Sequence, residues 1–303
     1  MRKGDFCLKE HDEIKLDLHI HSCLSDGTAN YAKIVSEAKT NGVGLISITD
    51  HDVVANLDLM KKNCAGTGLS FLTGVEFSAV LDGNLHHILG YGFDWSNEAI
   101  IKLMENNLRH EAVWQNRREE FWIKQLIDVG CPVDLEEFAS ADGGAKPSPG
   151  NQFKSKIFTF LIQKGIIIDK KDYFDRLFPL VAGKPFTKIP PDFPHPVDVI
   201  EVIKTAGGIP VIAHPVWTYN KLSLTDTLDL FKGFKIEGIE CYRYDFNRET
   251  TDVCLKYCEN NNLIITAGSD YHGNTIGSPE IGLPAITINQ CRLGVLAERI
   301  IYR

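Results

Sequence analysis

The chain has 303 residues, 44% of them hydrophobic, which is enough to bury the core of one barrel-sized catalytic domain without disulfide staples. Its 32 Lys and Arg residues against 40 Asp and Glu residues give a formal net charge of −8, which argues against broad, charge-driven binding to duplex nucleic acid. No apolar run reaches about 18 residues and no signal-like apolar stretch stands at the start, so we expect a cytoplasmic protein with reduced thiols and no membrane contact.

Strands and helices alternate in the first third of the chain and again in the last third. The strands are predicted from short apolar, β-branched runs bounded by turn residues, which is typical of strands buried in a parallel sheet. They cover residues 14–20, 44–49, 69–80, 85–93, 209–213, 236–241 and 263–267, with helices over 32–40 and 56–64. This alternation of strands and helices predicts an α/β barrel formed by residues 1–96 and 196–303.

The alternation of strands and helices stops in the middle of the chain. Residues 97–128 are charged and helical in pattern and predict one long or broken helix. A Gly/Pro/Ser-rich loop over 140–150, helices near 153–163 and 171–177, and a Pro-rich exit over 188–196 follow. We therefore predict that residues 97–195 form a helical insertion between barrel strands.

Histidines and carboxylates stand just after several of the predicted strands. Residues past the ends of parallel strands gather at one mouth of an α/β barrel. Imidazole and carboxylate together suit Zn, Fe, Mn or Co, and this series holds more donors than one ion can use. The pattern predicts a polynuclear hydrolytic site. Its members are Asp17, His19, His21, Asp26, Asp50, His51, Asp52, Glu76, His86, His87, His214, Asp270 and His272.

A single histidine near a strand end is more often a hydrogen-bonded core residue than a metal ligand, and we interpret His110 and His195 in that way. His19 and His21 differ, because alternate residues of a strand point to the same side and can chelate one ion. Alternation has the opposite effect on His86 and His87, which point to opposite faces, so only one of them can face the mouth.

Cys254 and Cys258 lie one helical turn apart, which suits either a metal site or the buried stripe of a helix. We favour the buried stripe, because the pair has no further metal ligand near it in the sequence.

The order of motifs, HxH, SDG, TDHD, GxE, a histidine before two apolar residues and Gly, AHP and GSDxH, resembles the PHP (polymerase and histidinol phosphatase) superfamily of metal-dependent phosphoesterases. The resemblance covers residues 15–282 and is greatest to the stand-alone bacterial nucleotide phosphatases, some of which are 5′–3′ exoribonucleases. It implies a distorted (β/α)7 TIM-like barrel that holds two to three divalent ions, Mn, Fe or Zn.

The same resemblance implies a ligand set and selects His87 over His86. The first ion is held by His19, His21, Glu76 and Asp270. The second is held by Asp26, His51 and His272. Glu76 bridges to a third ion, which is held by His87 and His214. Glu76, His214 and Asp270 are the implied catalytic residues.

Physical chemistry makes this allocation reasonable. A bridging carboxylate keeps two cations about 3.5 to 4 Å apart, and coordination brings the pKa of water to about 7, so a metal-bridging hydroxide can attack phosphorus. Asp17 and Asp52 are predicted to orient imidazoles through the ring nitrogen that binds no metal. For Asp52, helix capping or a solvated charge is an equal alternative.

We expect hydrolysis of a small phosphomonoester, a nucleoside monophosphate or 3′,5′-bisphosphate, with a short oligoribonucleotide as a further substrate. The alternatives are a histidinol-phosphatase-type or cyclic-phosphate hydrolase and a noncatalytic PHP interaction module. Candidate substrate-binding residues are Arg117, Arg118, Lys184, Lys188 and Arg243, since guanidinium suits bidentate recognition of phosphate. A solvated helix face is the alternative for Arg117 and Arg118.

The chain departs from the nucleotide-directed relatives at two places. Gly150-Asn151-Gln152-Phe153 stands where they carry Gly-Arg-Pro-His, and Val216-Trp217 stands where Gly-Arg often follows AHP. Both changes remove groups that contact phosphate or base, which puts bisphosphate and oligoribonucleotide substrates in doubt.

Overall fold

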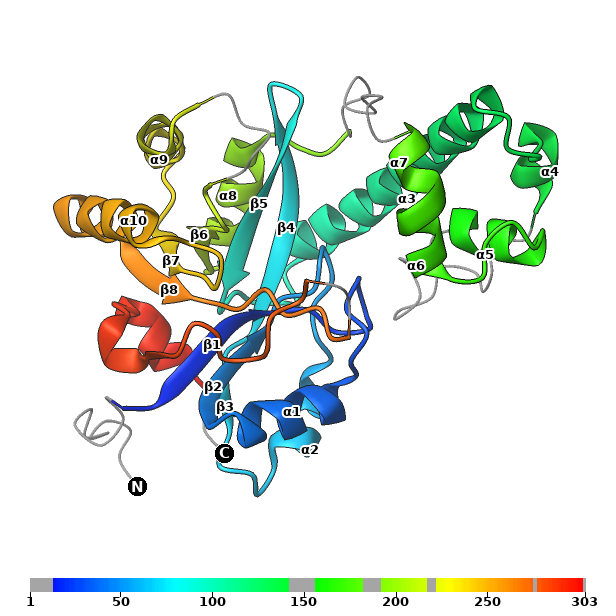
Figure 1. The fold of residues 1–303 in the computed structure, drawn as a ribbon. Helices are drawn as coiled ribbons and strands as arrows, with labels where there is room; N and C mark the ends of the chain where they lie inside the picture. The colour runs from blue at the N-terminus through cyan, green and yellow to red at the C-terminus, as the bar shows by residue number, and fades with distance from the viewer. Residues whose placement is uncertain (1–12, 142–155, 182–191, 217–221, 275–276, 302–303) are drawn as a thin grey trace.

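The computed structural model describes residues 13–141, 156–181, 192–216, 222–274 and 277–301. Figure 1 shows strands in the centre of an α/β molecule, helices on either side of them, and a long helix that leads away to a group of shorter helices. The predicted α/β class is correct. Among the described residues, no helix is long and apolar enough to span a bilayer.

One sheet has four strands in the order β3-β2-β1-β9. β1, β2 and β3 pair in parallel, and β9 pairs antiparallel to β1. Two helices, each begun by an asparagine whose side chain accepts from a backbone N–H, pack against this sheet through a shared apolar cluster. The elements are β1 (Lys15–Ile20), α1 (Tyr31–Thr40), β2 (Val43–Ile48), α2 (Leu57–Cys64), β3 (Ser70–Phe71) and β9 (Ile286–Thr287).

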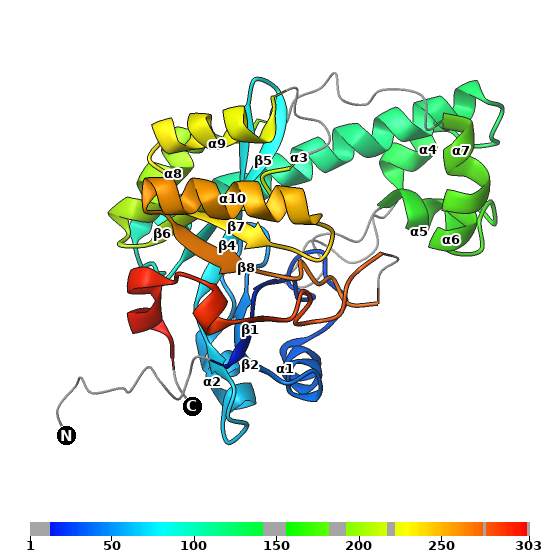
Figure 2. The same ribbon diagram turned by 60° about the vertical axis from the view of Figure 1, so that its left-hand side comes forward.

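The other sheet has five strands in the order β4-β5-β6-β7-β8. Three helices, α8, α9 and α10, lie beside this sheet (Figure 2). They supply apolar side chains to the cluster that packs against it. Its elements are β4 (Gly74–Leu81), β5 (Asn84–Tyr91), α8 (Pro196–Thr205), β6 (Ile209–Ile212), α9 (Leu224–Gly233), β7 (Gly238–Tyr242), α10 (Arg248–Asn261) and β8 (Ile264–Ala267).

The expectation of parallel strands is wrong for β4 and β5, which form an antiparallel hairpin, and β5 is also antiparallel to β6. The reason lies in the turn. Asp82 and Gly83 both have positive φ, 50° and 76°, as a two-residue hairpin turn requires. Such a turn reverses the chain at once and leaves no room for the crossover that a parallel neighbour needs.

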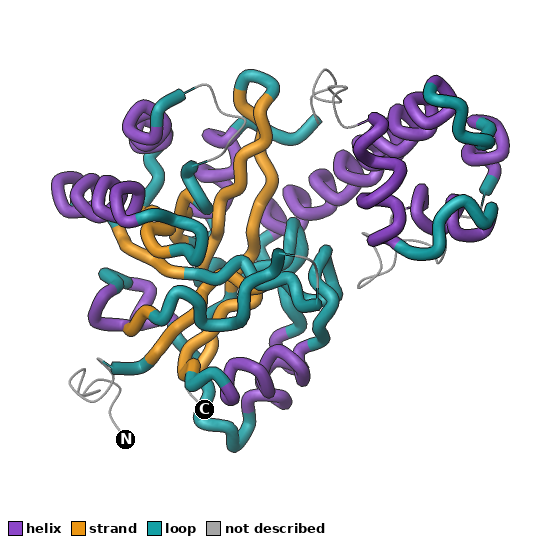
Figure 3. The backbone as a smooth tube through the Cα atoms, viewed as in Figure 1, coloured by secondary structure: helices purple, strands orange, loops and turns teal. Residues whose placement is uncertain are grey.

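Isolated bridges join the two sheets where donor residues stand. His51 pairs with Glu76, and Ile20 pairs with Tyr271, both in parallel. Within the described ranges the strands therefore form two adjoining sheets, with loops from both meeting at the same place, as the tube in Figure 3 shows.

The middle of the chain is helical. α3 runs unbroken over 31 residues and joins two apolar clusters. Ile100 and Leu103 near its start pack into the core of the five-stranded sheet, whereas Ile123 and Leu126 near its end pack with Phe160 in a separate helical core. The helical elements are α3 (Glu98–Asp128), α4 (Leu135–Ser140), α5 (Lys156–Gln163), α6 (Lys170–Asp172), a π-helical turn (Tyr173–Leu177) and α7 (Phe178–Val181).

Two of the remaining sequence expectations concern the cysteine pair and His195. Cys254 and Cys258 are fully buried on α10, as expected, in the apolar cluster of the five-stranded sheet, with the Cys258 Sγ 3.6 Å from that of Cys241. The expectation of a core position is wrong for His195, whose side chain is exposed. His195 is the N-cap of α8, and its Nδ1 accepts from the Val197 N–H at 3.2 Å, a role that a side chain at the surface can fill.

Candidate metal centre

His19 on β1 and His21, the first residue past its end, turn their rings to the same side and are completely buried. Their Nε2 atoms are 3.1 Å apart. A Glu76 oxygen lies 3.2 Å from the His19 Nε2 and 3.1 Å from the His21 Nε2, and an Asp270 oxygen lies 3.4 and 3.2 Å from the same two atoms. These four side chains, which were predicted to hold one ion, therefore present their donor atoms to one point.

A second group adjoins the first. The His272 Nε2 is 3.2 Å from an Asp26 oxygen, and the His51 Nε2 is 3.6 Å from the same oxygen. His21 belongs to this group as well, because its Nδ1 is 3.3 Å from the other Asp26 oxygen. The sequence did not place His21 in both groups. An imidazole whose two nitrogens face different groups brings the groups into contact.

Glu76 stands between the first group and a third. Its Oε2 faces His19 and His21, whereas its Oε1 lies 3.0 Å from the His87 Nδ1 and 2.9 Å from the His214 Nε2. The His51 Nδ1 is 3.3 Å from Oε2. Two oxygens that face opposite sides are what a bridging carboxylate needs.

Alternation along β5 separates His86 from His87. His87 faces Glu76, and His86 lies on the opposite face of the sheet with its ring 5.3 Å from that of Phe231. Burial there lowers the pKa of His86 to about 4. His86 is therefore a core residue without access to the donor groups.

The backbone at the donor residues adopts a rare conformation. His214, Asp270 and Asp52 have positive φ values of 25°, 58° and 50°. Non-glycine residues in this region are uncommon, each costs about 1 to 3 kcal/mol, and they concentrate at functional sites. The strand ends thus hold these side chains in directions that regular extended backbone would not provide.

The charges of the site compensate one another. Burial lowers the pKa of the His19 imidazole, but the carboxylates around it, Glu76 foremost, raise it to about 10. Burial raises the pKa of Glu76, yet the surrounding imidazoles, with His87 foremost, hold it well below its usual range. So many buried carboxylates favour positive charge between them, and the mixed N and O donors fit divalent transition-metal ions.

The aspartates predicted to orient imidazoles have other partners. Asp17 accepts from the backbone N–H groups of Ser269 and Gly282, at 2.9 and 2.7 Å. Burial, opposed by these hydrogen bonds, raises its pKa to about 6. The carboxylate that does accept from an imidazole is Glu240, whose Oε1 is 2.9 Å from the His19 Nδ1. Glu240 lies inside the strand predicted over 236–241 rather than after it, so the strand-end signal that marked the other donors did not identify it.

Asp52 connects the metal centre to the long helix. Its Oδ1 accepts from the Asn107 side chain of α3 at 2.7 Å and from the Ser78 N–H at 3.2 Å. Burial raises its pKa to about 7. Asp50 accepts from the hydroxyls of Ser22 and Ser25 and orders the loop that carries Asp26.

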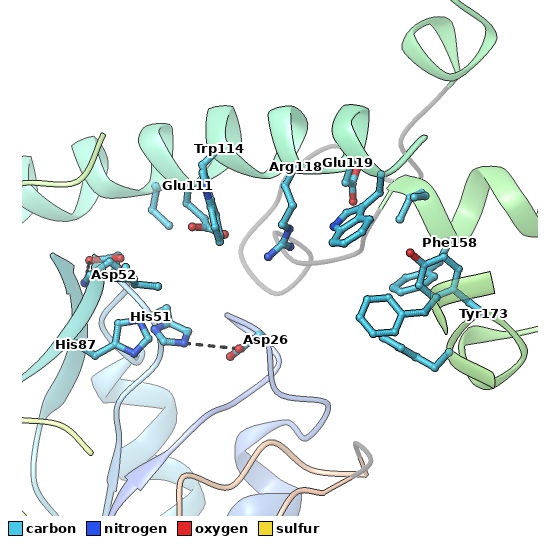
Figure 4. A pocket seen from close by; sticks show the side chains of 17 residues that line it. Asp26, His51, Asp52, His87, Glu111, Trp114, Arg118, Glu119, Phe158 and Tyr173 are labelled. Carbon is cyan, nitrogen blue, oxygen red and sulfur yellow. Dashed lines mark hydrogen bonds and ion pairs between the residues drawn. The ribbon is translucent and has the colours of Figure 1, made fainter. Parts of the chain in front are cut away.

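A cavity of about 530 Å³ opens between the donor groups and α3. Figure 4 shows Asp26, His51 and His87 on one side, Trp114 and Arg118 descending from α3, and Phe158 and Tyr173 on the far side. The Arg118 guanidinium lies over the Trp114 ring at 4.7 Å. The aromatic residues that line the cavity are Trp114, Trp122, Phe158, Tyr173, Phe174 and Phe178.

The other candidate substrate-binding residues are placed differently. Arg117 does not line the cavity and forms an exposed ion pair with Asp192 at 3.5 Å. Arg243 follows β7 and contacts an Asp270 oxygen at 3.1 Å and Asp245 at 2.8 Å. Lys184 and Lys188 lie outside the described residues, as do the residues 150–153 and Trp217 that depart from the relatives' pattern.

Fold and donor set together define an α/β protein whose clustered His, Asp and Glu side chains fit a polynuclear metal centre. Residues 17–141 match the model of the PHP domain family.

Curated relatives match most of the chain. A 5′–3′ exoribonuclease of Haemophilus influenzae is 28% identical, over 85% of this chain and 90% of its own. A phosphoribosyl 1,2-cyclic phosphate 1,2-diphosphodiesterase of Eggerthella lenta is 26% identical, over 88% and 97%. A 3′,5′-nucleoside bisphosphate phosphatase of Chromobacterium violaceum is 25% identical, over 88% and 90%.

Two solved structures share the fold. One, described as an amidohydrolase of Chromobacterium violaceum, has a TM-score of 0.72 at 23% identity and is covered over 98% of its length, against 95% of this chain. The other, described as a metal-dependent phosphoesterase of Bifidobacterium adolescentis, has a TM-score of 0.67 at 24% identity, over 96% of its length and 95% of this chain. The likeness extends over nearly the whole length of each chain.

Proposed function

We propose that this protein is a metal-dependent phosphoesterase that hydrolyses a small phosphomonoester, with a nucleotide as the substrate. The observation that carries the proposal is the continuity of one cavity from Asp26, His51 and His87 to an aromatic wall, with Arg118 between them. Such a cavity offers metal ligands to a phosphate at one end and ring faces to an organic group at the other.

Two to three divalent ions, Mn, Fe or Zn, would supply the positive charge that neutralises the phosphate and acidifies a water for attack on phosphorus. The ligand groups proposed are His19, His21, Glu76 and Asp270 for the first ion, Asp26, His51 and His272 with His21 for the second, and Glu76, His87 and His214 for the third. Every one of these side chains belongs to the buried or half-buried part of the site.

Residues of the chain would then bind and orient the substrate. Arg118 can donate to a second anionic group, because within the described part of the chain its guanidinium makes no ion pair, and its stacking on Trp114 holds it over the cavity. Rings such as Phe158 and Tyr173 can stack on a base and exclude water. Relatives that act on nucleoside bisphosphates and on RNA support this class of substrate.

We also propose the domain division that the sequence indicated. Residues 1–96 and 196–303 would form a distorted seven-stranded barrel, and residues 97–195 would form a helical cap over its mouth. The separate apolar core at the far end of α3 and the position of α3 above the cavity support a cap.

The test is phosphate release by metal-loaded protein. The panel comprises nucleoside monophosphates, 3′,5′-bisphosphates, cyclic phosphates, histidinol phosphate and short oligoribonucleotides. We expect turnover of a nucleotide, loss of that activity on chelation, and recovery when Mn²⁺, Fe²⁺ or Zn²⁺ is returned. Full activity of demonstrably metal-free protein would refute the proposal, and a preference for cyclic phosphates would select the diesterase alternative, which one relative supports.

A further inference from the structure

Glu240 lies in the middle of β7, completely buried, and makes contacts in two directions. Its Oε1 is 2.9 Å from the His19 Nδ1, and its Oε2 accepts from the His214 backbone N–H at 2.8 Å. Glu240 is absent from the three groups of metal-donor atoms. One carboxylate therefore contacts two candidate metal ligands from different strands without facing the metals itself.

The first contact determines how His19 presents its ring. A carboxylate accepts, so the His19 Nδ1 carries the proton and donates it to Glu240. The Nε2 is the nitrogen that faces Glu76 and Asp270, at 3.2 and 3.4 Å, so it is the one that binds an ion once the ion displaces its proton. The contact with Glu240 keeps the Nδ1 proton in place and holds the ring in one rotation.

The second contact holds the backbone of His214. This residue follows β6 and has a φ of 25°, a left-handed conformation that a histidine rarely adopts. Its N–H donates to Glu240 rather than to a neighbouring strand. The side chain that results from this backbone conformation places its Nε2 2.9 Å from the Glu76 Oε1.

Gly268, just past the end of β8, leaves the space that the His19–Glu240 contact needs. A Cβ at this residue would stand 2.2 Å from the His19 Cβ and 2.9 Å from the Glu240 Oε1. Any side chain there would push the two partners apart. The steric requirement at Gly268 is independent of the hydrogen bonds and points to the same pair.

We propose that Glu240 is a positioning residue of the metal centre, which fixes the His19 tautomer through one oxygen and the strained His214 turn through the other, and so couples the first ion's ligands to the third ion's. The inference rests on the proposed function, since it assigns metals to this site. It predicts that loss of the Glu240 charge weakens metal binding while Glu240 itself is no ligand.

The experiment compares wild type, Glu240→Gln and the control Glu237→Gln by competition of the intact protein with a chelator for Zn²⁺ or Mn²⁺. The amide can accept from only one of the two donors, so we expect metal affinity to fall about 10 to 100-fold. Glu237 enters the same strand but forms only a half-exposed ion pair with Lys204, so its substitution should leave the affinity unchanged.

Melting of the metal-free proteins separates positioning from mere packing. A packing role would lower the melting temperature of Glu240→Gln and leave its metal affinity within about threefold of wild type, a result that would overturn the inference. Wild type that binds metal but hydrolyses no phosphate ester would defeat the proposed function alone, because the affinity comparison needs no turnover.

A second measurement applies if Glu240→Gln does not fold. Imidazole ¹⁵N spectra of zinc-loaded wild type, labelled at histidine, report which ring nitrogen of His19 carries the proton. We expect the proton on Nδ1. A proton on Nε2 would contradict the assigned contact and with it the role of Glu240.

Discussion

The strand-end metal centre and the helical wall opposite it are built in different ways. The donors at the strand ends are buried or half-buried and are held by several contacts, as Glu76 is between five imidazoles. The wall carries half-exposed rings such as Phe174, at 46% exposure, and an arginine without an ion pair among the described residues. The rigid side can fix the chemistry, and the looser side can select the substrate.

The two regions also differ in how much free energy their charge interactions contribute. Removing one partner of a buried charge network leaves the other uncompensated and costs about 3 to 5 kcal/mol. An exposed ion pair such as Arg117 with Asp192 contributes about 0 to 1 kcal/mol. Substitutions at the strand ends should therefore affect every substrate, and substitutions on the wall should affect some substrates only.

The largest effect is expected from Glu76→Gln. The substitution removes a negative charge from between two groups of imidazoles while keeping the size of the side chain. Loss of even an outer partner of a ligand costs about 10 to 100-fold, so we expect more than a 100-fold fall in kcat and loss of bound metal. Metal analysis and turnover on every active substrate are the measurements. Near-normal metal content and turnover would mean that the ligand allocation is wrong.

His87→Ala and His86→Ala test the strand register. Loss of His87 removes an imidazole from Glu76 and should lower the number of bound ions and cut kcat by about 100-fold. Loss of His86 removes only the ring contact with Phe231 and should cost about 1 kcal/mol of stability. Equal effects of the two substitutions on metal content would show that both histidines reach the site.

Arg118→Ala and Arg117→Ala test whether the helical side of the cavity selects the substrate. A charge-assisted hydrogen bond is worth about 1.5 to 3 kcal/mol, so Arg118→Ala should lower kcat/KM by roughly 10 to 150-fold for substrates with a second anionic group. Small generic phosphomonoesters should be hydrolysed as before. Arg117→Ala is the matched control and should change neither. An unchanged substrate preference in both variants would assign selection to Arg243, Lys184 or Lys188.

The smallest effect on chemistry is expected from Phe160→Leu in the helical core. Phe160 packs against Phe138 with ring centres 5.3 Å apart, in an apolar cluster that contains no proposed metal ligand. We expect a loss of about 1 kcal/mol in stability, measured by thermal melting, and unchanged metal affinity. A parallel fall in metal affinity would show that the two regions form one cooperative unit.

Local patterns in the sequence determined much of this protein. The alternation of His19 with His21 and of His86 with His87 sets the face on which each side chain lies, because the strand period is a property of the backbone itself. The helical pattern over 97–128 likewise matches α3 closely. The sequence also shows which histidines and carboxylates follow apolar strand runs, and these could be predicted as metal ligands before the fold was known.

The tertiary structure alone decided which residues meet. Glu240 is 221 positions from His19, and only the strand order, with β8 adjoining β1, brings the two together. Asp17 was predicted to orient an imidazole and instead binds amides of distant loops, and Arg118 rather than Arg117 faces the cavity. Periodicity and residue type act over a few residues, whereas a partner's identity depends on the packing of whole strands and helices, which no local pattern specifies.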